Sequence, residues 1–122
     1  MSDGRDPALD PASVARLLRL GGDELAGKMA SLFLGLAPDR VRAAREGLDA
    51  GDADAVRRAA HSLKSSSGNV GALAVMEAAG RLEDAAERGD GLEVLAALLS
   101  AMESALQAAL PELRALAEGG PG

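Results

Sequence analysis

The sequence contains no cysteine, tryptophan or tyrosine, and it has only one phenylalanine and one histidine, Phe33 and His61. Without cysteine the chain has no disulfide framework and no thiol chemistry. A zinc site of ordinary type needs three or four nitrogen, sulfur or oxygen ligands, and one histidine with scattered carboxylates does not supply them. We therefore expect no metal site in this protein.

Residues that favour strands are also scarce. The chain has no isoleucine and no threonine, and alanine and leucine dominate instead. Aromatic and β-branched residues are those enriched in strands, whereas alanine and leucine rank at the top of the helix scale. The composition predicts an all-α protein.

Length and charge narrow the class further. The 122 residues are enough for one domain with a core of its own. The net charge of −6 argues against binding to nucleic acid, which favours a basic surface and stacking aromatics. There is no uninterrupted run of eighteen or more apolar residues and no signal-peptide pattern at the start. We expect a cytoplasmic protein that binds neither nucleic acid nor membrane.

Glycine, proline and aspartate divide the chain into helical blocks. Asp10 followed by Pro11 is typical of a helix start, and apolar residues then recur at helical spacing in each block. Pro38 interrupts the second block, but the periodicity continues across it, which favours one kinked helix. The predicted helices span residues 11–20, 23–50, 53–67, 72–88 and 92–117.

The connections between the four longer blocks are only a few residues long. Such connections force neighbouring helices to run antiparallel. We therefore predict an up-down-up-down four-helix bundle over residues 10–117, with the short additional helix at 11–20 covering one end. Residues 1–9 and 118–122 are expected to be flexible ends.

Candidate chemistry is concentrated around His61. In the helix predicted at 53–67 the apolar stripe leaves His61 on the opposite, solvent-facing side. Lys64 and Ser65, three and four residues on, share its surface, as does Arg57 four residues before it.

This arrangement suits a phosphoryl acceptor. A neutral imidazole is a nitrogen nucleophile near pH 7, and a cation one turn away, Lys64, would stabilise the charged adduct. The small residues Ser65 and Gly68 would leave room for a partner's active site. The plainer interpretation is that His61 and Lys64 are ordinary surface residues and that the glycines only form a turn.

The segment from His61 to Ala72 resembles the signature of the histidine phosphotransfer (HPt) domains of two-component phosphorelays, written H-x-L-K-G-S-S-x-x-x-G-A. The resemblance extends over residues 10–117. One position differs, since Ser65 stands where the family most often has glycine, and this bears on partner fit. The matching residues are His61, Leu63, Lys64, Ser66, Ser67, Gly71 and Ala72.

The resemblance implies a role for each matching position. His61 would be phosphorylated, through Nε2, and Lys64 would steady the phosphoryl group. Glu83 would accept the Nδ1 proton of the ring and so orient it. The chain would be a carrier without kinase activity, and it has no nucleotide-binding loop of the kinds used by ATP-dependent enzymes.

The partners implied are response-regulator receiver domains and a hybrid sensor kinase, with Mg²⁺ supplied by the receiver. The expected docking surface surrounds His61 and includes Arg57 and Arg58, with Leu17 and Leu18 at its edge. A basic surface would suit an acidic receiver pocket, although each arginine could equally serve only to solubilise its helix. We expect a monomer.

Two other functions remain open at this point. The chain could be a helical adaptor that binds a signalling partner without phosphate chemistry, with His61 incidental. It could also be the phosphorylated domain of a larger chemotaxis-type kinase.

Overall fold

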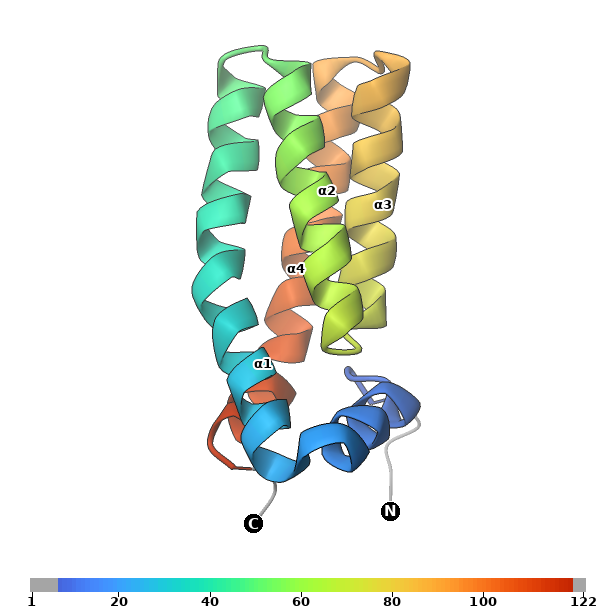
Figure 1. Cartoon of the computed structure of the whole chain (residues 1–122). Coiled ribbons are helices and arrows are strands. Elements are labelled where there is room, and N and C mark those ends of the chain that lie inside the picture. The colour runs from blue at the N-terminus through green and yellow to red at the C-terminus, as the bar shows by residue number, and fades with distance from the viewer. Residues whose placement is uncertain (1–6, 120–122) are drawn as a thin grey trace.

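The structure is a computed structural model, and it describes residues 7–119. These residues form four helices and no strand: α1 (Pro11–Asp49), α2 (Ala53–Asn69), α3 (Leu73–Arg88) and α4 (Leu92–Ala117). Figure 1 shows an antiparallel bundle in which the chain runs up, down, up and down. Each helix packs against two neighbours, in the cyclic order α1, α2, α3, α4. The predicted all-α four-helix bundle is confirmed.

Helix α1 contains the predicted short N-terminal helix as its first segment. The helical backbone is interrupted at Gly21 and Gly22, and Gly22 has φ 66° and ψ −162°, a region that only glycine adopts readily. The segment before this break turns across one end of the bundle (Figure 1). Beyond the break the helix continues through Pro38, as the periodicity predicts.

Side-chain caps fix the starts of two helices. Asp10 accepts a hydrogen bond from the backbone N–H of Ser13, at 3.3 Å, and Asp52 accepts one from the N–H of Ala55, at 3.0 Å. Each bond satisfies a donor that the first helical turn leaves free. The Ser13 hydroxyl also donates to Asp10, and this bond lowers the pKa of the Asp10 carboxyl.

Helix α2 is longer than predicted, because it ends at Asn69 rather than at residue 67. Gly68 therefore lies inside the helix, and the chain turns at Gly71, which has φ +75°. A Cβ built on Gly71 would lie 2.7 Å from the Cβ of Ser13, and the Gly71 carbonyl accepts the N–H of Asp10 at 2.7 Å. The absence of a side chain at Gly71 thus lets the start of α1 dock against the α2–α3 turn.

The prediction that residues 1–9 are flexible is wrong for Ala8 and Leu9. Leu9 is buried in the core, with 5% of its surface exposed. The N–H groups of Ala8 and Leu9 donate to the carboxylate of Glu112 on α4, at 2.6 and 3.2 Å. These contacts fasten Ala8 and Leu9 to the bundle. Residues 1–6 and 120–122 lie outside the described part of the chain, and residues 118 and 119 form a turn that follows α4.

The core consists mainly of leucine and alanine, with three valines, Phe33 and Met102. Its stripe on α2 is the predicted one, so the opposite face of that helix is turned to solvent. By length and composition alone, α4 could cross a membrane, a property that core helices of soluble proteins share. In the bundle one side of α4 packs into the core. The largest fully buried side chains are Leu63, Leu82, Leu95, Leu99, Met102 and Leu113.

Candidate functional site

His61 lies in the middle of α2, on the side facing away from the core. Its neighbour Ala60 and the following Leu63 are completely buried, whereas 61% of the His61 side chain is exposed. The helix thus presents the imidazole ring to solvent, and a molecule that docks on this face can reach it.

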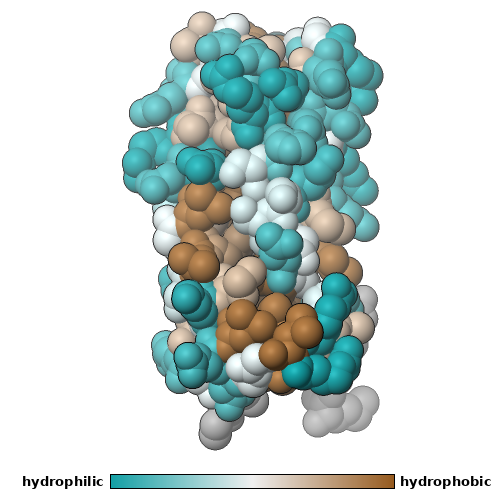
Figure 2. Space-filling view, viewed as in Figure 1, coloured by the Kyte–Doolittle hydropathy of each residue, from teal (hydrophilic) through white to brown (hydrophobic). Residues whose placement is uncertain are grey.

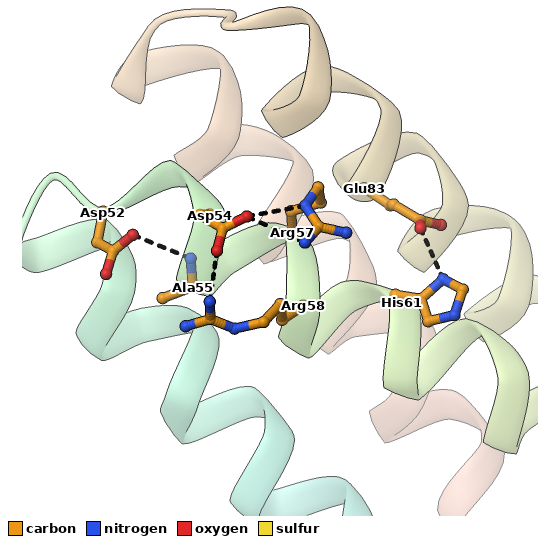
Figure 3. Close-up of polar contacts among 7 residues, drawn as sticks. All are labelled: Asp52, Asp54, Ala55, Arg57, Arg58, His61 and Glu83. Carbon is orange, nitrogen blue, oxygen red and sulfur yellow. Dashed lines mark hydrogen bonds and ion pairs between the residues drawn. The ribbon is translucent and has the colours of Figure 1, made fainter.

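Glu83 on α3 approaches the ring from the neighbouring helix. Its Oε2 lies 2.7 Å from Nδ1 of His61 (Figure 3), and only 11% of the Glu83 side chain is exposed. An ionised carboxylate only accepts hydrogen bonds, so this contact places a proton on Nδ1. In a neutral ring the lone pair then lies on Nε2, and no residue from 7 to 119 donates a hydrogen bond to Nε2.

Lys64 binds the other oxygen of the same carboxylate. Its Nζ lies 2.7 Å from Oε1 of Glu83, and among the described residues this ion pair is the one polar contact of the buried Oε1. The Lys64 ammonium and, to a smaller extent, the His61 ring lower the pKa of Glu83, although burial opposes this shift. In return the Glu83 carboxylate raises the pKa of Lys64. Lys64 and Glu83 are both charged at neutral pH.

Arg57 and Arg58, which the sequence predicts to lie on the basic docking surface, are paired with an acidic side chain. Both guanidinium groups pair with the carboxylate of Asp54, Arg57 at 3.0 Å (Figure 3). The three side chains together carry one positive charge rather than two. The basic character of this face is therefore weaker than expected.

Ser65 and Gly68 line an open groove between α2 and α3 beside His61 and Lys64. Ser65 is exposed, as access for a partner requires. Gly68 has a structural reason to lack a side chain, because an added Cβ would lie 3.1 Å from Sδ of Met76 on α3. Its small size therefore serves helix packing as well as the shape of the groove.

Leu17 and Leu18 lie on the first segment of α1, below the C-terminal end of α2. Leu18 is 39% exposed, and Leu17 is partly buried against the core. Figure 2 shows apolar side chains gathered on the lower part of this face and along α1, with polar ones above. His61 lies about two helical turns from the end of α2, so these leucines flank the site rather than contact it.

Arg40 was not among the expected site residues. Its Nε donates to the hydroxyl of Ser62 at 2.8 Å, which brings a guanidinium from α1 next to the residue that follows His61. Only the packing of α1 on α2 creates this contact, so no local sequence pattern predicts it.

The site as a whole combines an exposed imidazole ring, a fixed tautomer and an adjacent ammonium. This combination can take up an electrophilic, anionic group such as a phosphoryl group. Among residues 7–119 there is no group of three or more carboxylate or imidazole side chains that could hold a metal ion.

Comparison with known proteins agrees with this chemistry. The Hpt domain family matches residues 28–116 of the chain. The crystal structure of histidine-containing phosphotransfer protein B (HptB) from Pseudomonas aeruginosa PAO1 is similar, with a TM-score of 0.82 and 30% sequence identity, over 93% of this chain and 97% of that one. A comparison with curated protein sequences gives no match. The chain belongs to the Hpt domain family, and it is a phosphotransfer carrier of two-component signalling.

Proposed function

We propose that this protein accepts a phosphoryl group on Nε2 of His61 from the aspartyl phosphate of a receiver domain and passes it to a second receiver. The observation that carries the proposal is the contact of 2.7 Å between Nδ1 of His61 and the buried carboxylate of Glu83. With the proton on Nδ1, Nε2 would be the nucleophilic nitrogen of a ring whose side chain is 61% exposed.

The transfer step needs no proton movement. The lone pair of Nε2 attacks phosphorus, a P–N bond forms, and the P–O bond to the receiver's aspartate breaks so that the aspartate leaves as a carboxylate. The ring keeps its Nδ1 proton and becomes cationic, and the negative Glu83 stabilises that charge. The reverse step restores the neutral ring with the same tautomer.

The receiver would supply the acidic pocket and the Mg²⁺, and this chain would supply no kinase activity. Lys64 would steady the phosphoryl oxygens, since its side chain is 40% exposed and lies one turn from His61. A hybrid sensor kinase would stand upstream, and we expect a monomeric, cytoplasmic carrier.

Receivers would dock over α2 and the first half of α1. Ser65 allows close approach to the ring, and the exposed apolar side chains of Leu18, Leu20 and Leu32 offer area for burial. Arg57, Arg58 and Arg40 would add modest electrostatic steering, because two of these three share one carboxylate.

The test is covalent uptake from a phosphorylated receiver domain. We expect phosphate that is labile in acid and stable in alkali, located by mass spectrometry on His61 and absent from His61→Gln. Label that survives in His61→Gln would refute the assignment. Receiver binding that is unchanged in His61→Ala, together with no phosphoryl uptake, would instead support the adaptor function.

A further inference from the structure

We propose that Glu83 competes with the phosphoryl group for Lys64, so that Glu83 makes the phosphohistidine shorter-lived and a better donor. This inference rests on the proposed function only in taking His61 as the acceptor. It makes Glu83 a positioning residue for the transfer as well as the partner of the ring.

The competition follows from the two contacts of one carboxylate. Glu83 binds His61 through Oε2 and Lys64 through Oε1, each at 2.7 Å. Nε2 lies on the edge of the ring turned away from Glu83, so a phosphoryl group there lies across the ring from Oε1. On this proposal the ammonium would give up its contact with Oε1 in order to bind the phosphoryl oxygens.

Burial makes this exchange unfavourable for Glu83. Its side chain is 11% exposed, and in the unphosphorylated protein the Lys64 ammonium is the one polar partner that Oε1 has among the described residues. When Lys64 leaves, that oxygen remains buried without a partner, and unpaired buried charge is destabilising. The Lys64 side chain is 40% exposed and flexible, so its ammonium can move from one anionic partner to the other at little cost.

Phosphorylation thus places two anionic groups, the carboxylate of Glu83 and the phosphoryl group, beside the single ammonium of Lys64. Either the phosphoryl group or Glu83 is then without the ammonium. Both states are less stable than a phosphohistidine that does not share Lys64 with a carboxylate. The strain is relieved when the phosphoryl group departs, which suits a carrier that must release its cargo.

The first test uses the unphosphorylated protein. Lys64 and Lys28 are the only lysines of the chain. After brief acetylation at pH 8, the ratio of acetylated Lys64 to acetylated Lys28 therefore reports the reactivity of Lys64, with Lys28 as the internal reference. In Glu83→Gln we expect this ratio to rise about threefold or more, because a lysine without its carboxylate partner is more often deprotonated. Glu87→Gln, which removes an exposed carboxylate one turn further along α3, is the matched control. Glu87 raises the pKa of Lys64 less than Glu83 does, so this change should affect the ratio much less than Glu83→Gln. Equal ratios in wild type and Glu83→Gln would overturn the proposal.

The second test measures the lifetime of phosphohistidine formed with a small phosphoramidate donor. Glu83→Gln keeps an oxygen that can accept from Nδ1 but removes the charge. We expect its phosphohistidine to last about fivefold longer, the size of one partly exposed ion pair. When Lys64 is replaced by methionine, Glu83→Gln should no longer lengthen the lifetime, because only the effect of Glu83 on the charge of the ring remains.

The competition would be overturned if Glu83→Gln lengthened the phosphohistidine lifetime equally with and without Lys64, or if Glu83→Gln alone shortened it. Because phosphoramidate needs no receiver, this result is independent of the proposed function. Uptake from phosphoramidate without uptake from receivers would refute the carrier function while leaving the competition testable. If the protein transfers phosphate between receivers but Glu83→Gln changes the phosphohistidine lifetime equally with and without Lys64, the competition alone is refuted.

Discussion

Gly71 offers a sharp test of how the bundle holds its N-terminal segment. The residue has φ +75°, and its missing side chain leaves room for Ser13 at the start of α1. Replacing Gly71 with alanine should destabilise the fold for two separate reasons, a strained backbone and a collision.

Both contributions can be sized from the structure. A non-glycine residue in the left-handed region costs roughly 1–2 kcal/mol. The new Cβ would lie 2.7 Å from the Cβ of Ser13, a separation that real side chains essentially never show. Relieving such overpacking by backbone shifts typically costs about 1–3 kcal/mol. We expect Gly71→Ala to lower the free energy of unfolding by about 2–5 kcal/mol in total.

Gly89 provides the matched control. It ends α3 with φ +80°, but a Cβ there would meet no atom within 4 Å. Gly89→Ala therefore carries the backbone strain and the unfolded-state effect of a glycine-to-alanine change without the collision. The assay is urea unfolding followed by circular dichroism. If Gly71→Ala costs no more than Gly89→Ala, the close docking of α1 on the α2–α3 turn is refuted.

Three further predictions concern the core and the site. Leu82→Ala, at a completely buried position of α3, should lower the free energy of unfolding by about 2–5 kcal/mol in urea titrations. Because Lys64 and His61 lower the pKa of Glu83, the stability this group contributes is present above its unfolded pKa of about 4.3 and is lost as the pH falls through the lower folded value. Glu83→Gln should therefore flatten the acid side of a plot of urea midpoint against pH, and an unchanged slope would contradict the cited shift. Ser65→Arg should slow phosphoryl uptake from a receiver by about tenfold or more, as a loss of roughly 1.4 kcal/mol would, and leave uptake from phosphoramidate intact. Ser100→Arg, on α4 diagonally across the bundle, should change neither rate.

Most helix boundaries could be predicted because glycine and proline mark them. The ends of α3 and α4 lie within one residue of the expected positions. The end of α2 was misplaced because Gly68 is helical and the turn depends on Gly71 instead. The anchoring of Leu9 could not be predicted, since its partner Glu112 is more than a hundred residues away in the chain.

The site divides along the same line. The exposure of His61 and its proximity to Lys64 follow from the periodicity of one helix. The contact with Glu83 depends on how α2 and α3 pack, and in the sequence only the family resemblance suggests it. The pairing of Arg57 and Arg58 with Asp54, by contrast, follows from spacings of three and four residues that are visible in the sequence.

The central claim is that His61 carries a phosphoryl group between two receivers, and one relay measurement tests it most directly. A phosphorylated donor receiver is mixed with an unphosphorylated acceptor receiver, and phosphate on the acceptor is followed with wild-type protein, His61→Gln or neither. The account predicts labelling of the acceptor with wild type only. Labelling that proceeds equally well with His61→Gln would contradict it.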